Sequence, residues 1–212
     1  NAIRFLYVQV LHQPFEVELV IPKKAQRIPE LLTREEIGRI LGACANPKHR
    51  MLLATAYGCG LRVSEVVGLR VRHIDGERRQ LRIEQGKGAK DRLVPIGQVL
   101  LEQLRAYWRS CRPPEWLFPG RSQAEPLSIG AVQKIFTAAK RRAGIEKVCG
   151  IHGLRHAYAT HQLEAGLAVH RLQHRLGHQD IHSTLRYVHW VPQRGEGRGE
   201  PDLLAALEPD HG

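Results

Sequence analysis

Length, composition and charge narrow the functions that are open to this chain. It has 212 residues, 42% of them apolar, and its 32 basic and 21 acidic residues give a formal net charge of +11. A surplus of this size favours a polyanionic partner, and nucleic acid is the commonest one. No apolar run approaches the ~18 residues that a membrane span needs, and no segment has the pattern of a secretory signal. We therefore expect a cytoplasmic protein without a membrane partner.

The cysteines predict neither a disulfide framework nor a zinc site. Cys44, Cys59, Cys111 and Cys149 are widely and irregularly spaced, and they form no CxxC pair. We interpret them as reduced, structural residues.

Apolar periodicity and capping signals predict a mainly helical chain. Thr33 and Glu36 form a capping box, Pro47 suits the first turn of a helix, and Ser128 suits an N-cap. Helices are predicted over residues 2–11, 33–44, 47–58, 100–112, 128–143, 151–163, 169–176 and 202–207, with short ones beginning at Ser64 and at Ser183 or Thr184.

The pattern changes over residues 71–96. Residues 81–84 alternate between apolar and polar, residues 93–96 are mostly apolar, and the basic, glycine-rich segment 86–90 lies between them. This is typical of a β-hairpin, with a further short strand near 71–74. The fold class predicted is mainly α with a small antiparallel β-sheet (α+β).

One stretch near the C-terminal end carries the chemistry. His152 and Arg155 are three residues apart, so a helix brings them to one side. His178 follows after a glycine, and Tyr187 comes nine residues later. Guanidinium groups stabilise charge that builds on phosphoryl oxygens, and a phenol becomes a nucleophile when a neighbour takes its proton. Tyrosine, histidine and arginine together therefore indicate attack on a phosphodiester.

Metal binding is the rival interpretation of this histidine-rich region. Of the 12 histidines, eight fall between His152 and His189, some of them four apart. Neither an HExxH motif nor a cysteine or carboxylate completes a zinc ligand set, so we expect no native metal site. The remaining histidines are interpreted as structural or surface residues, among them His156, His161, His170, His174 and His182.

Six positions carry a resemblance to a known family. Arg62 lies in Gly-Leu-Arg-Val-Ser-Glu, Lys87 in Gly-Lys-Gly-Ala-Lys-Asp-Arg, and His152 and Arg155 in His-Gly-Leu-Arg-His. His178 follows Leu-Gly, and Tyr187 lies in Thr-Leu-Arg-Tyr-Val-His. With these motifs in this order, residues 30–190 resemble the tyrosine recombinases, or phage-integrase family. The resemblance implies the fold of the recombinase catalytic domain; integron-, transposon- and Xer-like relatives remain open.

The resemblance also implies a mechanism. Tyr187 would attack the scissile phosphate and form a 3′-phosphotyrosyl link, Lys87 would protonate the leaving 5′ oxygen, and His152 would assist proton transfer at the tyrosine. The phosphoryl oxygens would be bound by Arg62, Arg155 and His178. Because the covalent link stores the bond energy, the family needs no metal, ATP or other cofactor.

The same resemblance divides the chain and implies its partners. Residues 1–29 would be the end of a truncated N-terminal core-binding domain plus a linker, 30–192 the catalytic domain, and 193–212 a flexible tail with a short helix. The partner would be double-stranded DNA, bound by a homotetramer whose subunits exchange the C-terminal helix.

Further basic residues are candidates for contacts with the DNA backbone, although a solvated face is equally consistent with the sequence. The candidates are Lys90, Arg92, Lys134, Lys140, Arg141 and Arg142. Two other functions also remain open, a type IB topoisomerase-like enzyme and a non-catalytic DNA-binding regulator on the same fold.

Overall fold

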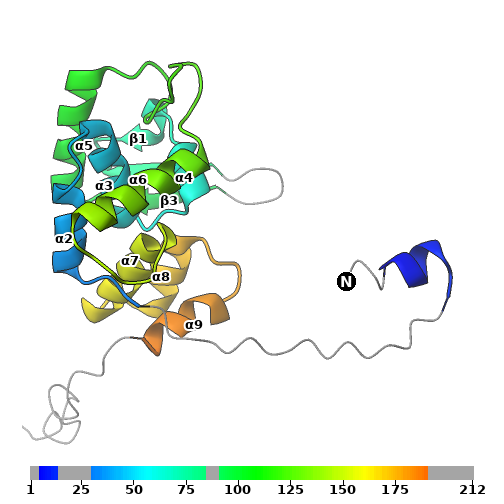
Figure 1. Cartoon of the computed structure of the whole chain (residues 1–212). Helices are drawn as coiled ribbons and strands as arrows, with labels where there is room; N and C mark the ends of the chain where they lie inside the picture. The colour runs from blue at the N-terminus through cyan, green and yellow to red at the C-terminus, as the bar shows by residue number, and fades with distance from the viewer. Residues whose placement is uncertain (1–4, 14–29, 85–90, 191–212) are drawn as a thin grey trace, which may run out of the picture.

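The computed structural model describes residues 5–13, 30–84 and 91–190, in which helices surround one small sheet (Figure 1). The helices are η1 (Leu6–Val10), α2 (Arg34–Gly42), α3 (Pro47–Gly58), α4 (Val63–Val67), η2 (Val71–His73), α5 (Gln98–Cys111), α6 (Ile129–Arg142), α7 (His152–Glu164), α8 (Val169–Leu176) and α9 (His182–Val188). The sheet is antiparallel in the order β1 (Ile74–Asp75), β2 (Gln80–Ile83), β3 (Arg92–Pro95). The predicted fold class is confirmed.

Helix starts follow the predicted local signals. Thr33 accepts a hydrogen bond from the amide of Glu36 at 3.1 Å, and the Glu36 carboxylate accepts from the amide of Thr33 at 2.7 Å. Pro47 occupies the first turn of α3, and Ser128 accepts from the amide of Ala131 at 3.2 Å. These side chains satisfy amides that a helix leaves without a partner in its first turn.

The short elements begin at residues other than those predicted. Residues 71–73 form a 3-10 turn, so the first strand begins only at Ile74. The helix expected from Ser64 begins at Val63, because Arg62 is its N-cap, and the last helix begins at His182.

The buried core holds the chemical segments together. α3 lies at its centre and buries Met51–Ala56 against α5 and α7. A second apolar cluster joins α7, α8 and α9 and includes Tyr158, Leu172, Leu176 and Tyr187. The helix that carries Tyr187 is thus packed onto the helix that carries Arg155.

Two glycines shape the backbone beside the site. Gly60 has φ +62°, and a Cβ there would lie 2.3 Å from the Tyr158 ring, so both the conformation and the space require glycine. Gly177 has φ +64° and ends α8. These turns leave backbone carbonyls facing the site.

Several predictions fall outside the described residues. They concern Lys87, Lys90, the helix at 202–207 and the tail 193–212, and the proposed division at residue 29 also stays a prediction. Within the described parts of the chain, no helix is long and apolar enough to cross a membrane.

Candidate active site

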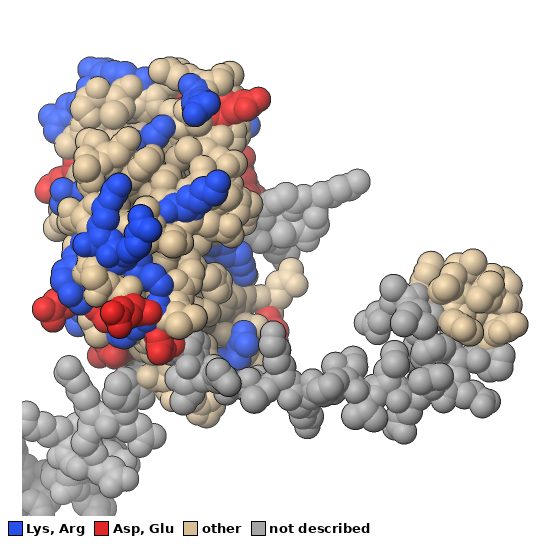
Figure 2. Space-filling model, in the orientation of Figure 1, with Lys and Arg blue, Asp and Glu red and all other residues tan. Residues whose placement is uncertain are grey.

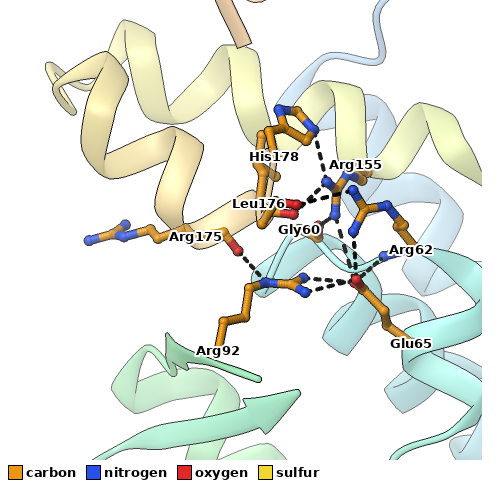
Figure 3. Close-up of polar contacts among 9 residues, drawn as sticks. Gly60, Arg62, Glu65, Arg92, Arg155, Arg175, Leu176 and His178 are labelled. Atoms are coloured by element: carbon orange, nitrogen blue, oxygen red, sulfur yellow. Dashed lines mark hydrogen bonds and ion pairs between the residues drawn. The ribbon is translucent and has the colours of Figure 1, made fainter. Parts of the chain in front are cut away.

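A buried carboxylate, Glu65, gathers three guanidinium groups (Figure 3). It accepts two hydrogen bonds from Arg92, both at 2.8 Å. It also accepts from the backbone amide and from Nη1 of Arg62, again at 2.8 Å each. Nη1 of Arg155 lies 3.7 Å from Oε2 of Glu65. One residue therefore caps the start of α4 and holds the arginines in place.

The charges around Glu65 keep it ionised. Burial alone would raise the pKa of this carboxyl group, but the hydrogen bonds and charge of Arg92, together with the hydrogen bonds from Arg62, lower it below its ordinary value. The side chain is only 8% exposed, so the pairing is largely shielded from solvent.

Arg155 is held by backbone carbonyls as well as by charge. Its side chain is 1% exposed; Nη1 donates to the Gly60 carbonyl at 2.9 Å and Nη2 to the Leu176 carbonyl at 2.7 Å. Arg62 donates to the next carbonyl, that of Gly177, at 3.4 Å. The C-terminal end of α8 is the negative end of its dipole, so it suits both cations. Burial and the charge of Arg62 lower the pKa of Arg155 to about 10, which still leaves it charged at neutral pH.

The position of His178 is fixed from both ring nitrogens. Nη2 of Arg155 lies 3.0 Å from Nε2, and Oγ1 of Thr184 lies 2.8 Å from Nδ1. A guanidinium can only donate, so Nε2 accepts and the proton of the neutral ring is on Nδ1. Burial and the charges of Arg155 and Arg62 lower the pKa of His178 to about 4, so the ring is neutral.

Tyr187 projects from α9 into this site. It is 4% exposed, and its ring stacks on that of His178 with an interplanar angle of 9° and a centroid distance of 6.2 Å. Its hydroxyl oxygen lies 3.0 Å from Nδ1 of His156. Burial raises the pKa of the phenol, although the charges of Arg155 and Arg186 act to lower it. A phenol in this state needs a proton acceptor before it can act as a nucleophile.

The structure brings together Arg62, Arg155, His178 and Tyr187, as the sequence predicts. His152 is exposed on α7, and its ring meets the ring of His156 edge-on with centroids 4.4 Å apart. His156, which the sequence analysis interpreted as structural or surface, contacts the Tyr187 hydroxyl. The signal for it was present, because residues four apart share a helix face and His156 follows His152 at that spacing.

Glu65 is the second residue to which the sequence analysis gave no role. It follows the N-cap Arg62 by three residues, which is the spacing at which an acidic side chain reaches back to an N-cap amide. That spacing predicts the cap, but it does not predict the two further arginines.

Two of the residues expected to contact DNA are engaged within the protein. Arg92 is 6% exposed; besides Glu65, its Nε donates to the Arg175 carbonyl at 2.9 Å. Nζ of Lys140 donates to the carbonyls of Lys147 at 2.5 Å and Cys149 at 3.3 Å. Both cations therefore hold the fold, and the structure argues against Arg92 as a DNA contact because its guanidinium faces inward.

The other basic residues of α6 lie on the surface. Lys134, Arg141 and Arg142 are exposed. Figure 2 shows Lys and Arg side chains gathered on the face that α6 crosses in Figure 1. In the described ranges, by contrast, no group of three or more His, Cys, Asp or Glu side chains is placed to hold a metal ion.

Comparison with known proteins shows the family to which the chain belongs. The model of the phage integrase family matches residues 30–194. The chain belongs to the phage integrase family. A Sinorhizobium fredii protein, y4qK, whose name places it among integrase/recombinases, is 43% identical over 190 residues, which are 88% of this chain and 61% of the relative. The tyrosine recombinase XerA of Thermococcus kodakarensis is 35% identical over 196 residues, 86% of this chain and 69% of XerA.

A solved integrase-family structure has the same fold. The crystal structure of a XerA recombinase superimposes with a TM-score of 0.72 at 24% identity, covering 87% of this chain and 67% of that one. The chain spans about three fifths of the length of y4qK, the first of these relatives.

Proposed function

We propose that this chain is the catalytic part of a site-specific DNA recombinase that cuts and rejoins DNA through a 3′-phosphotyrosyl intermediate. The observation that supports it most is that the Tyr187 hydroxyl, Arg155 and His178 meet in one partly buried site although they come from three different segments. A protein that only binds DNA would not require a tyrosine hydroxyl, an arginine and a histidine to meet at one point. Membership of the phage integrase family supports the same activity.

In the proposed reaction Tyr187 attacks the scissile phosphate and the 5′ oxygen leaves. Negative charge then builds on the non-bridging oxygens, where charged, multidentate donors stabilise it most. Arg62 is the guanidinium that remains accessible, with a side chain 38% exposed, whereas Arg155 approaches from the buried side together with His178.

Two proton transfers complete the step. The phenol must lose a proton, and the family resemblance assigns this transfer to His152. The leaving 5′ oxygen must gain a proton, and the resemblance assigns this transfer to Lys87. Because the energy of the broken bond is kept in the phosphotyrosyl link, the proposed reaction requires neither metal nor ATP.

The assembly follows from the same proposal. Recombination joins two duplexes, so we propose a homotetramer on double-stranded DNA, with the segment 202–207 docking into a neighbouring subunit. The exposed α6 residues Lys134, Arg141 and Arg142 are proposed backbone contacts, as is Lys90. A cytoplasmic protein bound to the nucleoid would meet such a substrate.

The direct test is covalent capture. A nicked suicide DNA prevents rejoining, so a recombinase accumulates as a protein–DNA adduct that survives denaturation. DNA binding without any adduct would favour a non-catalytic regulator. An adduct together with relaxation of supercoils, but without strand exchange between two duplexes, would favour a type IB topoisomerase-like enzyme.

Replacement of Arg62 by alanine should lower the rate of adduct formation by on the order of 10²-fold or more, the loss expected for one transition-state charge donor. Arg62 is partly exposed, so the variant should still fold. Single-turnover cleavage measures the effect, with Arg78→Ala as a control because Arg78 is 80% exposed and lies outside the cluster around Glu65. A loss smaller than tenfold would mean that Arg62 has another role.

DNA affinity should fall steeply with salt. For each phosphate contact, the logarithm of the binding constant should decrease by about 0.9 per tenfold rise in salt concentration. If Arg141 is such a contact, Arg141→Ala should reduce the salt slope by about 0.9. Arg92→Met should leave the slope unchanged, because the Arg92 guanidinium is turned toward Glu65. Titrations at several salt concentrations measure both, and an equal change of slope in the two variants would contradict the assignment.

A further inference from the structure

We propose that His156 is a catalytic residue of this site and that its Nδ1 takes the phenolic proton of Tyr187 as the phosphate is attacked. The inference rests on the proposed function. It assigns to His156 the transfer that the family resemblance places at His152.

The first support is the geometry of the pair. Nδ1 of His156 lies 3.0 Å from the Tyr187 hydroxyl oxygen, within the range that a general base requires. The pair comes from α7 and α9, which pack against each other. Trp190 meets both rings edge-on, at centroid distances of 5.6 Å from His156 and 5.2 Å from Tyr187. The two reacting groups are therefore held in place before DNA arrives.

The second support is the direction of the hydrogen bond. Burial raises the pKa of the phenol, and the nearby positive charges of Arg155 and Arg186 oppose that effect. When the proton of the neutral His156 ring is on Nε2, the phenol donates to Nδ1, which is the direction that deprotonation needs.

The third support is the charge state of the acceptor. Burial and the positive surroundings lower the pKa of His156 to about 4, so the ring is neutral and can accept a proton. The groups that face it are His152 and Arg155 on its own helix, His178 before α9, and Arg186 and Tyr187 on α9. A scissile phosphate would bring negative charge into this cluster, and nearby negative charge favours protonated imidazole. The base therefore strengthens when substrate is bound.

The position of His152 fits a supporting role. It lies on the exposed side of His156, with the two rings edge-on at 4.4 Å. In that place it can limit the movement of the His156 ring, whereas His156 occupies the position next to the phenol.

The O–H bond of Tyr187 breaks and its proton passes to Nδ1 of His156, while the phenol oxygen forms a bond to phosphorus. The bond from phosphorus to the 5′ oxygen breaks, and that oxygen takes a proton from the general acid, which is Lys87 in the proposed function. Religation reverses both transfers, so His156 returns the proton to the tyrosine.

The test is single-turnover adduct formation on nicked suicide DNA by the whole chain and its His156→Asn variant. The asparagine carbonyl oxygen can accept a hydrogen bond near the position of Nδ1, but it cannot take up a proton. We expect the rate to fall by about 100-fold or more, the scale of general-base catalysis. His161→Asn is the matched control, because His161 is on the same helix as His156 and its Nδ1 lies 2.9 Å from the hydroxyl of Tyr57 on α3. This variant should cleave at the wild-type rate.

A second DNA substrate distinguishes the loss of the general base from the loss of the general acid. DNA with sulfur in place of the bridging 5′ oxygen has a leaving group that needs no proton. On this DNA the rate of adduct formation by Lys87→Ala should recover, whereas the rate for His156→Asn should remain low. A His156→Asn rate within threefold of wild type, or its recovery on the sulfur substrate, would overturn the assignment while leaving the proposed function intact. Absence of any adduct with the wild-type chain would overturn both.

Discussion

Replacement of Tyr187 by phenylalanine should abolish covalent attachment to DNA while leaving DNA affinity nearly unchanged. The variant loses only the hydroxyl oxygen, which is the atom that would bond to phosphorus. The ring should keep its packing against His178 and Trp190, since neither contact depends on the hydroxyl. The hydrogen bond to His156 is lost, so a modest change in stability is expected and is measured by urea unfolding.

The chain offers a matched control for this variant. Tyr57 also hydrogen-bonds a histidine of α7 through its hydroxyl, at 2.9 Å from His161. Tyr57→Phe removes an equivalent tyrosine–histidine bond but should form the adduct at the wild-type rate. If Tyr187→Phe still formed an adduct, or if it failed to bind DNA, Tyr187 would not be a purely nucleophilic residue.

Replacement of Glu65 by glutamine should have the largest effect on stability. The substitution keeps the size of the side chain but removes the negative charge that Arg92, Arg62 and Arg155 share. Breaking a buried ion pair by removing one partner costs about 3–5 kcal/mol, because the other charge stays buried without compensation. Urea unfolding should show this loss, and adduct formation should fall with it because the arginines lose their anchor.

The pH dependence identifies the cause of that loss. The pKa of Glu65 is lower in the folded protein, so its contribution to stability is present above about pH 4.3 and is lost as the pH falls through the folded pKa. The difference between wild type and Glu65→Gln should therefore shrink on acidification. Glu36→Gln is the control, because Glu36 is paired with Lys147 at the edge of the molecule and should cost far less. A difference that does not depend on pH would point to packing instead.

Much of the fold can be read from local sequence. The capping box at Thr33 and Glu36, Pro47 in the first turn of α3, and Ser128 before α6 act through neighbours a few residues away. Helix starts are therefore predictable from short windows. The prediction of a strand at 71–74 was wrong over its first three residues, because a brief apolar run does not distinguish a strand from a 3-10 turn.

The family and the residue types of the site can be predicted from sequence, because the motifs around Arg62, Arg155, His178 and Tyr187 are compact and keep their order. Only the tertiary structure decided which neighbours those residues meet. Arg92 looked like a surface contact, but it pairs with Glu65 across 27 positions, and His156 meets Tyr187 across 31. These pairings depend on the packing of α4, α7, α8, α9 and β3, because it brings together segments that are far apart in the sequence.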